Sequence, residues 1–242
     1  MTVLTTDIVY YKSSDSGSVG GAISATTITS GVLNNLWDDV PASEALAGAT
    51  EYRKIFVKNT NGSDSLLYAI LWRNVDTLSS DDEIQIGIGT ASDDDGSSVL
   101  TALTEDSRIT LVSDGSDVRV VTLIGEDADG DYQTENVTLT STTPVDSVNT
   151  YSRLYLAYPA SSSGSRIITI TQKTTSVTLG TIGVSKLSAI LYLNPTSKAV
   201  GFQLGTLAAG ASHGIWLKRV VTAGAEPYNL NSGTIKVEGE TS

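Results

Sequence analysis

The sequence predicts an all-β protein with two β-sandwich-like domains, the second immunoglobulin-like and inserted into the first, and with one short helix. Thr, Ser, Val, Ile, Gly and Asp are abundant while Lys and Glu are scarce, which is the composition of strands and turns. Short apolar or alternating runs recur along the 242 residues, separated by turns rich in Gly, Asn or Asp. Two apolar runs that contain tryptophan, Ile70–Arg73 and Ile215–Arg219, lie on either side of a middle region with shorter strands. We therefore expect both ends of the chain to contribute to one domain.

The strongest strand signal lies between Glu51 and Asn74. Its first half alternates apolar and charged residues, and residues 66–72 form a nearly continuous apolar run. A run of that kind is expected in the centre of a sheet, covered on both faces. Asn61 and Gly62 lie between the two halves, and Asn-Gly favours the tight turn of a β-hairpin. We therefore predict a hairpin in the protein core.

The rest of the outer region contains weaker strand signals and one helix signal. Apolar residues at positions 32, 33, 36, 37 and 40 have helical spacing, which predicts a short helix before Pro41. We expect Trp37 to be a core anchor within it. Residues 43–48 are expected to form one further turn that ends at Gly48. The other predicted strands of this region are 6–12, 22–29, 83–89, 187–194, 200–204, 214–221 and 234–238.

From about Ser107 the strands become short, with turns every ten residues or so, which is typical of a small sandwich. We therefore predict a discontinuous outer domain, residues 1–104 plus 186–242, around an inserted immunoglobulin-like domain, residues 105–185. Two consecutive sandwiches are the alternative. The connecting turns carry Asp114-Gly115, Asp129-Gly130 and Ser163-Gly164, and the predicted strands are 109–112, 118–125, 133–140, 151–158, 167–172 and 176–181.

The chain has few residues for catalysis. It contains no cysteine, which excludes disulfide bonds and thiolate metal sites, and His213 is its single histidine. A Ser-His-Asp triad would have to use His213, which we expect in a turn just ahead of a strand, yet no Gly-x-Ser-x-Gly elbow accompanies it. No glycine loop of the phosphate-binding type is present either. We therefore predict that the protein is not an enzyme, and we assign no catalytic residue, no metal ligand and no cofactor.

The chain is strongly acidic, with 27 acidic and 15 basic residues and a net charge of −12. Binding to nucleic-acid phosphates requires a basic stripe, so no nucleic-acid partner is expected. No run approaches the roughly 18 apolar residues of a membrane span, and the N-terminus lacks the pattern of a secretory signal. We therefore expect no membrane partner.

One acidic segment has the spacing of a possible cation loop. Asp127, Asp129 and Asp131 alternate around Gly130, as carboxylates do at the start of a calcium loop. The position that would supply the bidentate glutamate is Thr138, and the flanking residues are strand-like, so an Asp-Gly hairpin turn is the favoured interpretation. Calcium binding by the three aspartates stays open at this point. A second acidic segment, 92–98, is predicted to be an exposed and mobile loop.

Several segments together resemble virion structural proteins of tailed bacteriophages and their archaeal relatives. The N-terminal part of that group is similar to Gly20–Ile23, Leu33–Val40, Glu44 and Gly48–Asn59. Its end is similar to Leu204–Gly210, Gly214–Arg219 and Ala223–Ala225. The middle segments 121–130, 135–139 and 150–151 are similar to small β domains that recur across phage capsid and tail proteins.

The resemblance implies a non-enzymatic virion structural protein of the capsid decoration or cement type. Such a protein would bind the major capsid protein and neighbouring copies, as a homo-oligomer with a trimer favoured, and would reside in the virion after assembly in the host cytoplasm. We expect the N-terminal arm, residues 1–20, to be loose and to pair with neighbours by strand addition. The alternative is a tail or baseplate module, or a carbohydrate-binding module that recognises a receptor.

Overall fold

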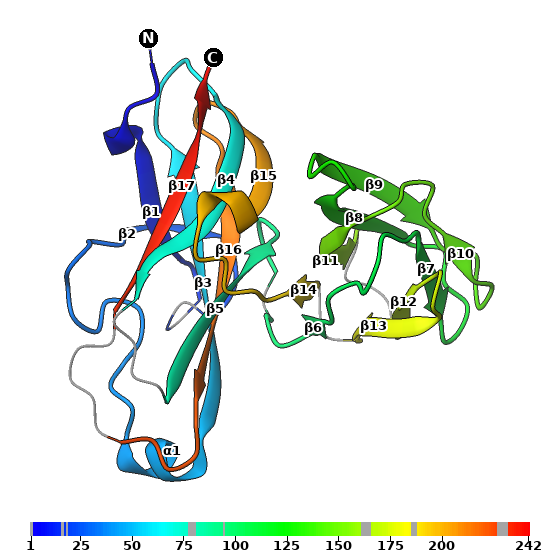
Figure 1. The fold of residues 1–242 in the computed structure, drawn as a ribbon, viewed down its shortest axis with the longest axis horizontal. Coiled ribbons are helices and arrows are strands. Elements are labelled where there is room, and N and C mark those ends of the chain that lie inside the picture. The colour runs from blue at the N-terminus through cyan, green and yellow to red at the C-terminus, as the bar shows by residue number, and fades with distance from the viewer. Residues whose placement is uncertain are drawn as a thin grey trace. The chain divides into compact units, whose positions relative to one another are not determined.

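The computed structural model describes residues 2–15, 17, 19–76, 81–93, 95–160, 166–184, 188–226 and 232–242, with the backbone alone for residues 75 and 76. Contacts divide the chain into two compact units (Figure 1). Unit 1 combines Met1–Ser92 with Leu193–Ser242, and unit 2 is Asp93–Tyr192. The inserted domain predicted from the sequence, residues 105–185, therefore lies within unit 2.

The described residues of unit 1 form two sheets, the 3-10 helices η1 and η3, and one α-helix. The five-stranded sheet has the order β2-β1-β3-β16-β5, and the three-stranded sheet has the order β15-β4-β17. The elements are η1 (Thr5–Asp7), β1 (Ile8–Ser13), β2 (Ile23–Thr27), α1 (Ala42–Ala47), β3 (Ala49–Asn59), β4 (Leu66–Asp76), β5 (Asp82–Gly89), η3 (Lys198–Val200), β15 (Phe202–Leu207), β16 (Ser212–Val221) and β17 (Gly233–Thr241).

The core of unit 1 is built on the pairing of β3 with β16. The two strands are antiparallel, with Ser212 opposite Lys58 at one end and Val221 opposite Ala49 at the other. Four successive residues are buried in each strand, 54–57 in β3 and 214–217 in β16. Since successive side chains of a strand point to opposite faces, both faces of this sheet are covered here. Many close cross-strand pairs therefore hold the two ends of the chain together in one unit.

The two sheets of unit 1 are also linked by a tyrosine. Tyr10 of β1 donates a hydrogen bond from its hydroxyl to the carbonyl oxygen of Ile235 in β17, at 3.2 Å. Burial raises the pKa of the Tyr10 hydroxyl, so it keeps its proton and remains a donor.

The described residues of unit 2 also form two sheets. One has the order β10-β7-β12-β13 and the other β6-β14-β11-β8-β9. β6 and β14 pair in parallel, which places residues near both ends of unit 2 in the same sheet. The boundaries between unit 1 and unit 2 consequently fall after residues 92 and 192, whereas the boundaries predicted from the sequence fall after residues 104 and 185. The strands are β6 (Val99–Leu100), β7 (Ile109–Ser113), β8 (Val120–Glu126), β9 (Tyr132–Thr138), β10 (Val145–Asp146), β11 (Arg153–Pro159), β12 (Ile168–Gln172), β13 (Val177–Ile182) and β14 (Ala189–Leu191).

This architecture confirms the predicted fold class, all-β and sandwich-like with one short α-helix. All six strands predicted for the middle region are present, and their ends lie close to the predicted positions. The two-residue strands β6 and β10 were not predicted. The turn at Ser163-Gly164 and the start of the strand predicted at Leu187 lie outside the described residues. The immunoglobulin-like character of unit 2 stays a prediction.

The predicted hairpin between Glu51 and Asn74 is wrong. Both strands exist as β3 and β4, and β4 is central in its sheet as expected, but the two strands belong to different sheets. The connection between them crosses from one sheet to the other. Asn61 shapes it, because its Oδ1 accepts hydrogen bonds from the backbone N–H groups of Ser63 at 3.0 Å and Asp64 at 2.9 Å. The Asn-Gly dipeptide therefore marks a turn that is held by the Asn61 side chain, and not a hairpin turn.

Two further expectations about the N-terminal third are wrong. Residues 30–40 form no helix, although α1 and its end at Gly48, with φ 78°, match the turn predicted there. Residues 8–13 are not part of a loose arm, because they form β1 between β2 and β3. Apolar residues at helical spacing in 30–40 were therefore a misleading signal: those at 32 and 33 are exposed, and Trp37 is half-buried.

Candidate functional site

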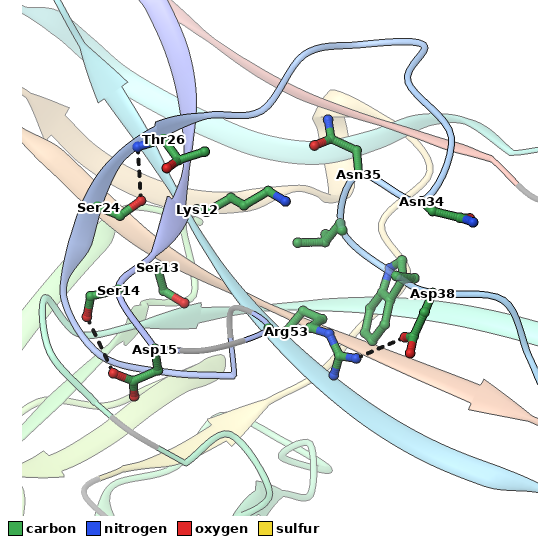
Figure 2. A pocket seen from close by; sticks show the side chains of 13 residues that line it. Lys12, Ser13, Ser14, Asp15, Ser24, Thr26, Asn34, Asn35, Asp38 and Arg53 are labelled. Carbon is green, nitrogen blue, oxygen red and sulfur yellow. Dashed lines mark hydrogen bonds and ion pairs between the residues drawn. The ribbon is translucent and has the colours of Figure 1, made fainter.

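A polar pocket of about 400 Å³ lies in unit 1 (Figure 2). Its lining comes from four places in the chain: residues 12–15 with Gly17, Ser24 and Thr26 of β2, residues 34–38, and Arg53 of β3. Hydroxyl, amide and charged groups dominate this lining. Ligand pockets in proteins usually have volumes of about 300 to 1,000 Å³, so this one is of the size that receives a small polar molecule.

One wall of the pocket is held by a tight chain reversal after β1. The N–H of Ser14 donates to the carbonyl oxygen of Ala22 at 2.7 Å, and Lys54 Nζ donates to that of Gly21 at 2.8 Å. Gly21 has φ +84°, and a Cβ atom there would lie 2.4 Å from Ser14 Oγ. Only glycine fits this conformation and this close approach. The reversal therefore fixes Asp15 at the edge of the pocket.

The opposite wall is anchored by Trp37. The guanidinium carbons of Arg53 in β3 and Arg219 in β16 each lie 4.9 Å from the centre of the Trp37 ring, within the range of cation–π attraction. Arg219 Nη1 also donates to the carbonyl oxygen of Asp38 at 3.2 Å, and Arg53 Nη2 donates to Asp38 Oδ1 at 3.3 Å (Figure 2). Two arginines of the sheet thus position an irregular segment that has no secondary structure of its own.

Glu51 completes this cluster. Its Oε2 accepts a hydrogen bond from Arg219 Nε at 2.8 Å, and its Oε1 lies 3.3 Å from Arg53 Nη2. Together with Asp38 it supplies two carboxylates for two guanidinium groups. The Trp37 cluster, which we define as Trp37, Asp38, Glu51, Arg53 and Arg219, is therefore electrically balanced within itself.

Three groups that line the pocket have no partner among the described residues. Ser13 Oγ and Arg53 Nε are buried and make no hydrogen bond, and Ser13 is only 5% exposed. Lys12 is half-buried and extends from β1 toward the segment that carries Asn34 and Asn35 (Figure 2), with no ion pair in the part of the chain that is described. Buried polar groups are normally paired. Ser13 Oγ and Arg53 Nε are enclosed by the protein itself, so a molecule in the pocket does not reach them.

The three aspartates of the possible cation loop lie in the turn between β8 and β9. Asp127 Oδ1 accepts hydrogen bonds from the N–H groups of Asp129 and Asp131, both at 3.0 Å, and Gly130 has φ +83°. The predicted Asp-Gly turn is confirmed, since the carboxylate of Asp127 closes the turn itself. Among the residues with described positions, no group of three His, Asp or Glu side chains is arranged to hold a metal ion.

The other two candidates differ in position from the sequence expectation. His213 lies inside β16 opposite Val57 rather than in a turn, with Nδ1 3.2 Å from the carbonyl oxygen of Gly214. Asp93 is 1% exposed and accepts a hydrogen bond from Ser188 Oγ at 2.8 Å, so the expectation of an exposed loop is wrong at this residue. Neither residue lines the polar pocket beside Trp37.

Comparisons with protein-family models, with curated proteins and with solved structures find no significant match to this chain. Within the described residues, no helix has the length and apolar character needed to cross a membrane.

Proposed function

We propose that this protein is a non-enzymatic structural component of a tailed-virus particle that decorates or cements the capsid shell. In this role it binds the major capsid protein and neighbouring copies of itself. The resemblance of the terminal segments motivates the proposal. The free edge of β17 is the structural observation that supports it, because a shell protein holds its neighbours through repeated symmetric contacts.

β17 is a nine-residue edge strand at the C-terminal end of the chain. Among the described strands it pairs with β4 alone, and its other edge has no strand partner. The carbonyl oxygen of Ile235 accepts a hydrogen bond from the Tyr10 hydroxyl, while the side chains of Glu238, Glu240 and Thr241 are exposed. An edge strand with free N–H and C=O groups is a template for adding another strand.

The sequence of β17 fits pairing with a second copy of itself. If two antiparallel copies met with a twofold axis at Val237, Lys236 of each copy would lie opposite Glu238 of the other. Opposite charges placed directly across two strands stabilise the pair, and each such contact contributes about 0.2 to 1 kcal/mol. Pairing of this kind gives a dimer, whereas the sequence resemblance favours a trimer, and the mass of the assembled protein distinguishes the two.

Particle composition tests the proposal. We expect intact, purified particles to contain this protein in many copies, in a fixed ratio to the major capsid protein when both are quantified by mass spectrometry. Soluble protein added to particles that lack it should bind to the shell and raise the temperature at which the shell opens. A few copies per particle would indicate a tail or baseplate position, and absence from the particle would refute the proposal.

The carbohydrate-binding alternative is favoured by a different observation, the polar pocket beside Trp37. Its hydroxyl, amide and charged groups offer donors and acceptors for the hydroxyl groups of a sugar. Such a module would sit on the particle surface and contact host glycans. Binding of purified protein to a glycan array tests this alternative independently of the position of the protein in the particle.

A further inference from the structure

We propose that Tyr68, Glu238 and Glu240, which together we call the Tyr68 site, receive the Lys236 side chain of a second copy of this chain. The inference rests on the proposed pairing of β17 with itself. It adds to that contact a residue of the neighbouring strand β4, and it gives the unusual backbone of that residue a function.

Tyr68 has a left-handed backbone conformation inside a strand, with φ 50°. The other described non-glycine residues with positive φ are Asn34, Ser141 and Ser176, and all three lie in turns. A bulky residue with positive φ is a rare conformation that costs free energy. Residues strained in this way cluster at functional sites, where the surrounding structure enforces them. The backbone of Tyr68 therefore points to a role beyond packing.

Tyr68 is also an extra residue of β4, the strand that lies between β15 and β17 (Figure 1). Toward β15, residues 67 and 68 lie opposite residue 206 alone. Toward β17, residues 68 and 69 lie opposite Gly239 alone. Position 68 is the one that both irregularities share. A β-bulge redirects a side chain, and here it leaves the side chain of Tyr68 68% exposed.

Glu238 and Glu240 of β17 flank Tyr68 on the outer face of the sheet. They pair with Ile70 and Leu67, the β4 residues on either side of the bulge, and directly opposite residues share one face. The other face of β4 is the buried one, with residues 66, 69 and 71. Glu240 makes no ion pair within the described part of the chain. An aromatic ring between two exposed carboxylates is a site that attracts a cation.

A second copy paired through β17 supplies that cation. With the twofold axis at Val237, Lys236 of the second copy lies directly opposite Glu238 and diagonally from Glu240. Because neighbouring strands are about 4.8 Å apart, β4 is about 10 Å from the added strand, a span that a tyrosine and a lysine side chain bridge together. The ring of Tyr68 then covers the Lys236–Glu238 contact between the copies and excludes water from it, as aromatic residues do in interfaces.

The cation that Glu238 has within its own copy is a weak competitor. Lys198 Nζ lies 3.8 Å from Glu238 Oε2, and about half of each side chain is exposed. An ion pair in that setting contributes little, because water screens the charges and two long side chains must be ordered. Lys236 of a second copy would meet Glu238 at a position that Tyr68 covers.

Sedimentation equilibrium of the whole chain and its variants tests the inference. Tyr68→Gly removes the ring and accepts the positive φ, so self-association should weaken about tenfold. The same variant, diluted until it is monomeric, should unfold at the same temperature as the native protein or at a higher one. Tyr68→Phe keeps the ring and should associate like the native protein. Leu46→Ala removes a side chain of similar exposure from α1 and is the control, with no change expected.

A double variant tests whether Tyr68 and Lys236 act on each other. Lys236→Gln alone should weaken association about tenfold. Combined with Tyr68→Gly it should weaken association little more than either change alone, because both variants remove the same contact.

Native association of Tyr68→Gly, or additive effects of the two changes, would overturn the inference and leave the β17 pairing in place. A lower unfolding temperature of Tyr68→Gly would also overturn it, because Tyr68 would then support the fold. If Tyr68→Gly associates normally but no longer binds to particles that lack the native protein, a capsid protein is the occupant instead of a second copy. A native chain that stays monomeric at high concentration would refute both the pairing and the inference, while detection of the protein in particles would be unaffected.

Discussion

Asp117 and Arg119 form a closely hydrogen-bonded ion pair in unit 2. Arg119 Nε lies 3.0 Å from both carboxylate oxygens, and Nη2 lies 2.6 Å from Oδ2. The hydrogen bond from Arg119 lowers the pKa of Asp117 below its ordinary value of 3.8, although burial opposes this shift. A carboxyl group whose pKa is lower in the folded state stabilises the fold above the pKa of the unfolded chain, and this contribution disappears as the pH falls through the folded pKa.

We therefore predict that Asp117→Asn lowers the free energy of unfolding at neutral pH by roughly 1.5 to 3 kcal/mol, the usual contribution of hydrogen bonds to a charged group. The difference from the native protein should shrink below about pH 4, where the carboxyl group of the unfolded chain becomes protonated. Thermal unfolding followed across this pH range measures both effects. Asp129→Asn in the exposed β8–β9 turn is the matched control, with little change expected. A difference that stays constant down to the lowest pH would contradict the assigned cause.

Single residues also explain why the pocket was not found from the sequence. Trp37 was expected to be a core anchor in a helix, and its partners Arg53 and Arg219 come from strands far apart in the chain. Arg53 lies in a stretch that alternates apolar and charged residues, and this pattern carries no information about the loop that lies over it. One feature of the sequence did point to the pocket. Residues 34–38 contain a tryptophan and an Asn-Asn pair, and outside a helix these side chains need partners from other parts of the chain.

At the level of elements, strands were predicted better than their pairing. Alternation and apolar runs report whether a stretch is extended and half-buried, and those are local properties. The segment from Glu51 to Asn74 contains β3 and β4 as expected, but the chain between them crosses to another sheet. Sequence neighbours usually pair, so the hairpin was the natural expectation. β3 pairs instead with β1 and with β16, and β16 lies more than a hundred and fifty residues away, which no local pattern identifies.

The β17 edge leads to a prediction about self-association. Lys236→Glu would place two glutamates opposite each other at both ends of the proposed twofold contact, so we expect association about tenfold weaker than in the native protein. The double variant Lys236→Glu with Glu238→Lys exchanges the charges and should restore association. Analytical ultracentrifugation measures the three proteins. If the native protein is monomeric at high concentration, or if the double variant associates no better than the single one, β17 is not the contact.

For the molecule as a whole, the sequence indicated one unit interrupted by another because apolar strands with tryptophan occur near both ends. Trp72 in β4 and Trp216 in β16 both belong to unit 1. The boundaries of unit 2 were harder to predict from the sequence. β6 and β14 contain only two and three residues, so they show no periodicity of their own. They are recognisable as part of unit 2 by their parallel pairing with each other and by the antiparallel pairing of β14 with β11.

That pairing supports a prediction about residues 93–192. Hydrogen bonds near both ends of this segment stay within it, from Ser188 Oγ to Asp93 and from the Tyr192 hydroxyl to the carbonyl oxygen of Gly96, both at 2.8 Å. Its core includes the fully buried side chains of Ile109, Leu111 and Leu123, which are supplied by its own strands. We expect the excised segment to fold alone, because a unit with its own core and closed ends needs no contact from the remainder of the chain.

Cooperative thermal unfolding and dispersed amide signals in a nuclear magnetic resonance spectrum would verify this expectation. A shorter segment, residues 105–185, provides the comparison, because it lacks β6 and β14. It should unfold at a lower temperature or remain unfolded, since its sheet then loses an edge and β11 loses a partner strand. Equal stability of the two segments would mean that the ends contribute nothing, and the boundary inferred from the sequence would be the physical one.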